Sequence, residues 1–180
     1  SAKRLVKRAG QAKGMELHFY QKVGIGTGNL ANNPWLQEFP DPLTRISWDN
    51  YLTISAADAL ELGIENWNES NGALNGTYAK VSANGTTLER VPVLIQPGQT
   101  KGTVGLAVGY GREAVGRVAD GVGVNAFLLK ESDHVTGVKV EPLEGSEHEF
   151  ASVQLAHTMM GREIVKETDL QTYLNRPAES

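Results

Sequence analysis

Turn signals built on glycine divide this chain into short segments. Asn84-Gly85 and Pro97-Gly98 are two-residue turn sequences, and each lies beside runs that are rich in β-branched residues. Asn-Gly is typical of the tight turn that joins two neighbouring antiparallel strands, because both turn positions need positive φ. The 20 glycines among 180 residues exceed the usual share of about 7%. We therefore expect a fold made of many short strands joined by turns.

The sequence pattern predicts six to eight strands and one short helix. Ser55 is placed to cap a helix over Ala56–Leu62, with Asp58 three residues further on and Gly63 at its end. Prolines are expected to exclude regular structure from residues 32–42. The segments with strand-like composition are residues 15–23, 47–55, 77–83, 87–95, 104–108, 122–129, 135–140 and 150–156. This spacing favours a mainly β fold with short helices, as a barrel or sandwich, over a doubly wound sheet.

Composition excludes several classes of partner and site. The net charge of −4 argues against nucleic acid as a partner, because phosphate recognition needs a basic surface. The chain has no cysteine, so it holds no disulfide, no thiolate metal site and no cysteine-bound iron–sulfur cluster. No apolar run approaches the ~20 residues of a membrane-spanning helix, so no direct membrane span is expected.

Several motifs occur in the order typical of one protein family. They are NPWL at residues 33–36, LTISAADALELGI at 52–64, VLIQPGQTKGTVGLAVGYG at 93–111 and VNAFL at 124–128. Together they resemble the C-terminal dinucleotide-binding domain of molybdopterin oxidoreductases, over about residues 15–140. The resemblance implies a double-psi β-barrel, the fold that this domain shares with aspartate decarboxylases.

Two further stretches narrow the resemblance. NNPWLQEFPDPLTRISWDNYLTIS at residues 32–55 and LAHTMMGREIVKETDLQTYLN at 155–175 are similar to the large, molybdopterin-oxidoreductase-like iron–sulfur subunit of bacterial alternative complex III. That family implies a membrane-associated, periplasmic complex that oxidises menaquinol. It also implies a pterin-enzyme half without molybdenum cofactor and iron–sulfur clusters in another domain. The partners would be the remainder of the same polypeptide and the other subunits.

The resemblance divides the chain into three parts. Residues 1–14 are interpreted as an expression-tag remnant followed by a helical lead-in. Residues 15–142 are expected to form the double-psi β-barrel domain. Residues 143–180 are interpreted as a C-terminal extension that leads toward an iron–sulfur domain outside this chain.

A glycine loop, GIGTGN at residues 24–29, follows the first expected strand and is the first candidate binding element. Consecutive backbone N–H groups in such a loop can form an anion-binding nest for a phosphate. The loop is not the G-x-G-x-x-G pattern of a Rossmann fold. The residues that would contact a pterin guanine dinucleotide here are Gly24, Gly26, Thr27, Asn29 and Asn33. The alternative is a glycine loop at a barrel rim, whose Asn and Thr side chains bind their own backbone.

Two more candidates lie near the end of the barrel sequence. Arg112, in GYGRE, could hold a pyrophosphate with two parallel hydrogen bonds, or form an ion pair with a neighbouring subunit. Asn125 matches an asparagine of the family motif, and the alternative is a cap on local backbone.

No catalytic residue and no metal site emerge from the other candidate residues. His148-Glu149 lacks the second histidine of the HExxH pattern. Trp35, Trp48 and Trp67 could stack on a flat ring, but packing or an interface is the commoner use of such residues.

Three functions stay open at this point. The first is a scaffold domain of a quinol-oxidising electron-transfer complex, without cofactor of its own and without catalytic activity in isolation. The second is the cofactor-binding C-terminal domain of an active molybdopterin (bis-guanine dinucleotide) oxidoreductase. The third is a free-standing β-barrel interaction module. Fold resemblance does not choose among them, because function depends on sites rather than on folds.

Overall fold

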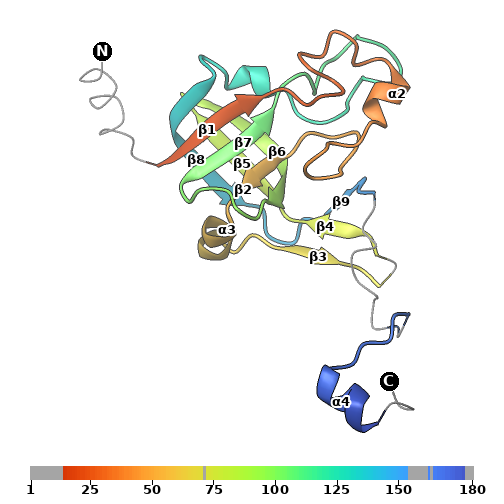
Figure 1. Ribbon diagram of the computed structural model, residues 1–180. Coiled ribbons are helices and arrows are strands. Elements are labelled where there is room, and N and C mark those ends of the chain that lie inside the picture. The colour runs from red at the N-terminus through yellow and green to blue at the C-terminus, as the bar shows by residue number, and fades with distance from the viewer. Residues whose placement is uncertain (1–13, 71, 154–161, 163, 177–180) are drawn as a thin grey trace, which may run out of the picture.

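A closed six-stranded barrel forms the centre of the molecule. The computed structural model describes residues 14–70, 72–153, 162 and 164–176. Around the barrel the strands follow the order β1-β7-β2-β6-β5-β8 (Figure 1). Their bounds are β1 Met15–Tyr20, β2 Leu52–Ile54, β5 Tyr78–Ala83, β6 Thr86–Ile95, β7 Thr103–Ala107 and β8 His134–Pro142. The pairs β1–β7 and β2–β6 are parallel, and the other neighbours in the barrel are antiparallel. The expected mainly β barrel with short helices is therefore confirmed.

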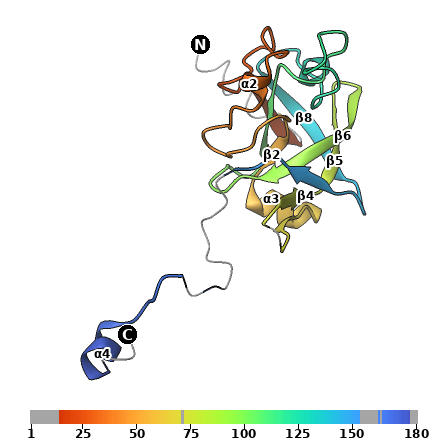
Figure 2. The ribbon, with the colours of Figure 1, turned by 90° about the vertical axis from the view of Figure 1, so that its right-hand side faces the viewer.

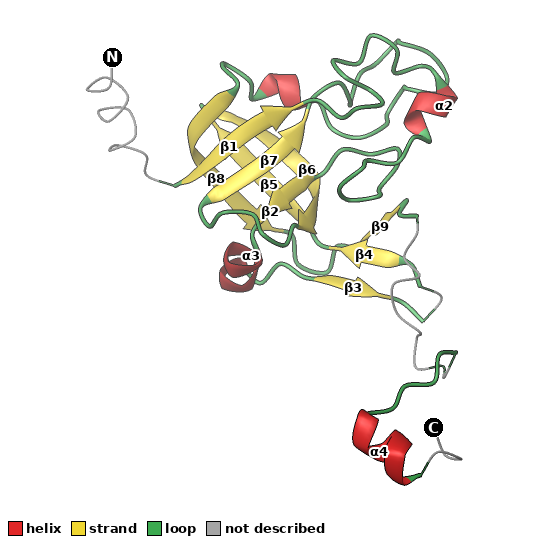
Figure 3. Ribbon diagram, in the orientation of Figure 1, coloured by secondary structure: helices red, strands yellow, loops and turns green. Residues whose placement is uncertain are grey.

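A second, smaller sheet lies beside one end of the barrel (Figure 3). It consists of β3 Asn66–Asn68, β4 Leu74–Gly76 and β9 His148–Phe150, in the order β3-β4-β9. The helical elements are α2 Pro34–Gln37, α3 Ala56–Leu62, the 3-10 turn η1 Ala126–Leu128 and α4 Leu170–Asn175. None of the residues of α4 is buried.

Alternating residues along the strands fill the barrel interior. On β1, Leu17 and Phe19 are buried while His18 between them is exposed, as expected for side chains that point to opposite faces of a strand. The inward-facing side chains that join them in one cluster include Leu52, Ile54, Val81, Val91, Val93, Val104, Leu106, Val138 and Val140. The alternation on β1 extends as far as Phe19, whereas Gln21 is exposed beyond the end of the strand.

The capped helix α3 has the predicted bounds. The Ser55 hydroxyl accepts a hydrogen bond from the Asp58 backbone N–H at 3.0 Å and donates one to the Asp58 carboxylate at 2.6 Å. The same carboxylate accepts the backbone N–H of Gly102 at 2.8 Å. Gly63 ends the helix with φ of 70°, which a glycine adopts without strain. Buried Asp58 therefore fixes both the helix and the β6–β7 turn.

Several sequence-based expectations were wrong. Residues 122–129 form no strand, because Gly121 and Gly123 have positive φ and the turn η1 follows. Residues 32–42 contain the single helical turn α2, since Pro34 occupies the first turn, where a proline lacks no needed hydrogen bond.

The strand bounds also changed. Residues 47–51 belong to no strand, and Trp48 among them has φ of 63°; only Leu52–Ile54 is strand. The expected strand at 150–156 is replaced by β9, which ends at Phe150, and by an isolated bridge from Ser152 to Ile46. Residues 154–156 and the expected lead-in at 1–13 lie outside the described residues.

Replacing Asp58 with alanine is expected to lower the free energy of unfolding by about 2 kcal/mol. The reason is that the substitution removes the acceptor for the Gly102 N–H and for the Ser55 hydroxyl. Urea denaturation followed by circular dichroism measures the loss. The control is Glu61→Ala on the same helix, where an exposed ion pair with Lys101 is lost and a much smaller loss is expected. Equal losses for the two variants would contradict the role given to Asp58.

Candidate functional site

Two long loops meet at one end of the barrel and form what we call the rim, residues 21–51 and 108–125. The first loop connects β1 to β2 and the second follows β7. In both ribbon views the two loops lie side by side beyond the strands (Figures 1 and 2). Contacts between the loops include the Asn32 side-chain oxygen, which accepts the Val118 backbone N–H at 3.0 Å. All the residues that the sequence predicts to bind a cofactor lie on this rim.

A fully buried asparagine connects the two rim loops. The Asn50 side chain donates to the carbonyl of Ala107 at 2.7 Å and to that of Val124 at 2.9 Å. Its side-chain oxygen accepts the Val124 N–H at 2.7 Å. Both amide hydrogens and the oxygen are thus bonded to backbone, which compensates for burying the polar group. No sequence pattern singles out Asn50.

The glycine loop crosses the second rim loop in direct backbone contact. A Cβ atom added to Gly28 would lie 2.5 Å from the Gly109 carbonyl oxygen, and one added to Gly109 would lie 2.8 Å from the Gly26 oxygen. Both Gly28 and Gly109 also have positive φ, at 91° and 97°. Only glycine satisfies both demands. These glycines therefore serve the close approach of two backbones.

Arg112 holds the glycine loop from the second rim loop. Its guanidinium donates to the carbonyl oxygens of Gly28 at 3.2 Å and Thr27 at 3.1 Å. The backbone N–H groups of Gly26 and Gly28 close turns within the loop, onto Lys22 and Ile25. The loop thus presents carbonyls to a cation of its own chain, and two of the N–H groups expected in an anion nest are already bonded.

The asparagines predicted to contact a cofactor cap helical turns. Asn33 accepts the Trp35 N–H at 3.0 Å at the start of α2, and Asn125 accepts the Phe127 N–H at 3.1 Å at the start of η1. The side chains of Thr27 and Asn29 are exposed. A Cβ at Gly24 would lie 2.8 Å from the Leu36 carbonyl. Whether any of these residues contacts a cofactor stays a prediction.

A hollow beside the rim brings two of the predicted residues together. It has a volume of about 520 Å³ and is lined by Gly111, Arg112, Glu113, Val115, Asn125 and Leu128. Gly24, Asn29 and Asn33 do not line it. The structure therefore groups Arg112 and Asn125 beside one hollow and places the remaining candidates elsewhere on the rim.

Lys22, which no sequence motif marks, lies buried at the base of the rim. Only 5% of its surface is exposed. Its ammonium donates to the Asp49 carbonyl at 2.6 Å and lies 4.1 Å from the Tyr51 ring centre and 5.4 Å from that of Tyr110. Burial lowers the pKa of Lys22 from its usual 10.5 to about 8, and the carboxylates of Asp41 and Asp49 oppose this shift.

A polar cluster continues from Lys22 toward the small sheet. The Asp49 carboxylate lies 3.1 Å from Nε2 of His148 on β9. Nδ1 of the same imidazole is 2.8 Å from the Tyr78 hydroxyl. Tyr51 forms a hydrogen bond with Thr44, and burial raises the pKa of Tyr51. Among the described residues no group of three or more His, Cys, Asp or Glu side chains is arranged to hold a metal ion.

The first rim loop exposes several large apolar side chains. Trp35 is 82% exposed and Leu43 is 81% exposed. We call the exposed apolar residues of this loop the apolar face; they are Val23, Leu30, Trp35, Phe39 and Leu43. By contrast, Trp48 and Trp67 are half-buried.

Comparison with known proteins adds no assignment: no protein-family model matches the chain, and neither does any curated protein. The fold and rim alone define a mainly β protein with a closed six-stranded mixed barrel and two interlocked loops at one end. Within the described ranges, no helix has the length and hydropathy needed to cross a membrane.

The buried ammonium of Lys22 predicts a pH-dependent stability. The folded pKa of about 8 lies below the usual 10.5, so the unfolded chain binds more protons between these values and stability rises with pH there. Unfolding by urea at pH 7 and pH 9 is expected to show a gain of about 1 kcal/mol, because tyrosines of the unfolded chain are still largely protonated at pH 9. Lys22→Met should abolish this gain, whereas Lys139→Met, at an exposed site, should keep it. Parallel pH curves for wild type and Lys22→Met would contradict the shifted pKa.

Proposed function

We propose that this chain is a non-catalytic scaffold domain of a membrane-associated, quinol-oxidising electron-transfer complex, and that it derives from a molybdopterin dinucleotide-binding domain. Its barrel would be of the double-psi type, which the mixed strand pairing and the crossed rim loops support. Its partners would be the remainder of its polypeptide and other subunits on the periplasmic side. The iron–sulfur clusters would belong to another domain.

The observation that carries this proposal is that polar side chains of the rim form hydrogen bonds to backbone of the same chain. Arg112 is bonded to the carbonyls of Thr27 and Gly28, and Asn33 and Asn125 cap helical turns. A site for a dinucleotide needs polar groups that converge on the ligand. Here part of the Arg112 guanidinium and the side-chain oxygens of both asparagines are bonded to backbone of the rim and its neighbouring turns, which favours a structural role.

The apolar face supports a second part of the proposal, that the domain docks onto other protein. Its five large side chains lie on one loop between β1 and β2. Large contiguous apolar patches mark protein interfaces, and five exposed apolar side chains on one loop make this loop the candidate docking surface. The exposed aromatic ring of Trp35 is the side chain best suited to anchor such an interface.

An active cofactor-binding domain is the alternative that one observation favours. The hollow of about 520 Å³ is bordered by both Arg112 and Asn125, and its size is within the range of ligand sites. The carbonyls of Thr27 and Gly28 take two of the five N–H donors of Arg112, so a pyrophosphate would be bound by the remaining donors. The free-standing interaction module would use the same apolar face with an unrelated partner.

Guanosine diphosphate is a direct probe of the hollow, because it carries the guanine and pyrophosphate of the dinucleotide. Calorimetric titration of the chain is expected to give no binding at concentrations up to about 1 mM. A dissociation constant in the micromolar range that is lost in Arg112→Ala would favour the cofactor-binding alternative and overturn the scaffold proposal. Glu113→Ala, at the border of the same hollow, controls for unspecific loss of a charge.

The double variant Trp35→Ser, Leu43→Ser tests the apolar face. Both side chains are more than four-fifths exposed, so the melting temperature should change little. Association with the purified remainder of the complex should weaken at least about tenfold, because anchoring residues dominate interface energy. Leu60→Ser on α3 is the matched control, since Leu60 is 84% exposed but lies outside this face. Unchanged association of the double variant would refute docking through the apolar face.

A further inference from the structure

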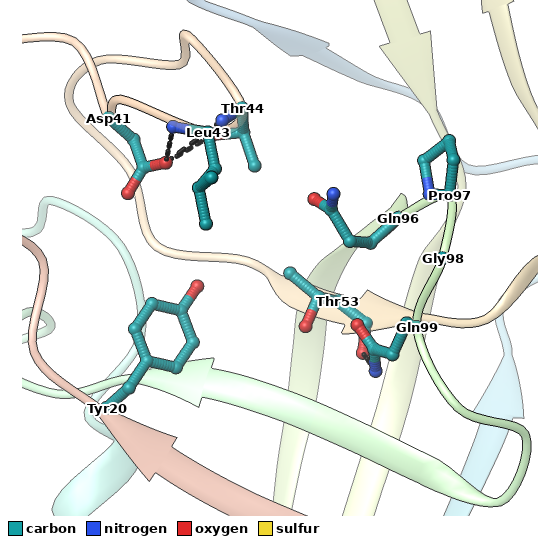
Figure 4. A pocket seen from close by; sticks show the side chains of 9 residues that line it. All are labelled: Tyr20, Asp41, Leu43, Thr44, Thr53, Gln96, Pro97, Gly98 and Gln99. Atoms are coloured by element: carbon teal, nitrogen blue, oxygen red, sulfur yellow. Dashed lines mark hydrogen bonds between the residues drawn. The ribbon is translucent and has the colours of Figure 1, made fainter.

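A cavity on the outer wall of the barrel is separate from the hollow beside Arg112. It has a volume of about 390 Å³ (Figure 4). The wall carries Tyr20 from β1 and Thr53 from β2, and two loop segments, 41–44 and 96–99, close its sides. Gly105 of β7 lies in this wall, where a Cβ would be 2.7 Å from the Thr53 hydroxyl and 3.4 Å from the Tyr20 ring. The glycine therefore lets these two side chains lie against the outer wall.

The side-chain donors of Gln99 and Thr53 at this cavity are bonded to carbonyls of the protein itself. The Gln99 side-chain nitrogen donates to the carbonyls of Thr53 at 3.0 Å and Thr103 at 2.6 Å. Both of its hydrogens are then engaged, so the amide offers only its oxygen to a ligand. The Thr53 hydroxyl donates to the Gly105 carbonyl at 3.4 Å, which leaves the lone pairs of that oxygen as acceptors.

Among the described residues that line the cavity, Asp41 alone carries a formal charge. One carboxylate oxygen accepts the backbone N–H groups of Leu43 at 2.9 Å and Thr44 at 3.0 Å, which fixes the group at the edge of the cavity (Figure 4). An ionised carboxylate has further lone pairs for a ligand. Lys22 also interacts with Asp41 electrostatically, but its ammonium is bonded to the Asp49 carbonyl at 2.6 Å.

The Tyr20 side chain completes the polar lining. Burial and the nearby Asp41 carboxylate raise the pKa of Tyr20, so the phenol stays neutral and its oxygen can accept a hydrogen bond. Apolar walls are supplied by the Tyr20 ring, Leu43 and Pro97. A cation with several N–H donors and a flat, weakly hydrated surface matches such a cavity, and a guanidinium has both properties.

We propose that this cavity receives an arginine side chain of a partner polypeptide, with its guanidinium paired to Asp41. A partner segment is favoured over a free small guanidine, because Leu43 belongs both to the cavity and to the apolar face. Apolar neighbours of the arginine would then rest on that face. This inference rests on the proposed docking role and adds the chemistry of one partner residue.

The test uses capped peptides with the 180-residue chain. Acetylated, amidated Leu-Arg-Leu is titrated against ¹⁵N-labelled protein, with Leu-citrulline-Leu as the neutral isostere and capped arginine as the form without apolar neighbours. Shifts are expected at Tyr20, Thr53, Gln96 and Gln99, with at least about tenfold weaker binding of the citrulline peptide because the charge-assisted hydrogen bonds are lost. Capped arginine should bind several-fold more weakly than the tripeptide.

Matched variants locate the binding. Asp41→Asn keeps an oxygen for the Leu43 and Thr44 N–H groups, so the loop should stay folded, and it should weaken the arginine peptide about tenfold. Gln96→Glu adds a second carboxylate to the lining and should strengthen binding, whereas Asp133→Asn, at an exposed site, should change nothing.

Four outcomes would overturn the inference. Equal binding of the arginine and citrulline peptides, or no effect of Asp41→Asn, would overturn it. Capped arginine binding as tightly as the tripeptide would make this a site for free guanidines and would overturn the partner assignment. The arginine peptide could fail to bind while the Trp35, Leu43 double variant still weakens association with the complex. That result would overturn this inference and leave the scaffold proposal standing.

Discussion

The buried side chain of Asn50 is the interaction on which the rim depends. Its amide bonds three backbone groups, at Ala107 and Val124, and thereby joins the end of β7 to both long loops. Neither loop forms a regular ladder of backbone hydrogen bonds, so buried backbone N–H and C=O groups need side-chain partners such as Asn50. The crossing of Gly28 over Gly109 and the bonds from Arg112 to the glycine loop are possible because Asn50 holds the loops in place.

The consequence for function follows from the same bonds. Polar groups that hold two loops together are not available to a ligand without cost, because a buried group left without a partner is destabilising. The first rim loop also exposes several large apolar side chains. Beside it lies a cavity in which Asp41 is the one charged residue among the described lining residues. Both features suit a surface that meets other protein. The chemistry of electron transfer would then lie outside this domain.

Local sequence signals predicted much of the barrel, but they did not predict contacts between residues that are distant in the sequence. The cap of Ser55 on α3 and the Asn84-Gly85 hairpin were predicted because each depends on residues a few positions apart. The strand expected at 122–129 was wrong, because a valine-rich pattern says nothing of the positive φ that Gly121 and Gly123 adopt. The strands β3 and β4 were missed, since asparagine and glycine are unfavourable in strands. They form through pairing of β3 with β4 and of β4 with the distant β9.

The same limit applied to the site. Asn50 bonds partners 57 and 74 positions away, so no sequence pattern marks it. The sequence does mark Arg112, Asn33 and Asn125 as candidate site residues. Both asparagines cap a local turn, which is a short-range interaction that a sequence can suggest.

The most direct measurement of the central claim is the molybdenum, tungsten and pterin content of the full-length protein, by elemental analysis and by fluorescence of the oxidised pterin. A scaffold domain predicts iron with neither molybdenum nor tungsten and no pterin. Stoichiometric molybdenum or tungsten with pterin would contradict it and would make the hollow beside Arg112 a cofactor site.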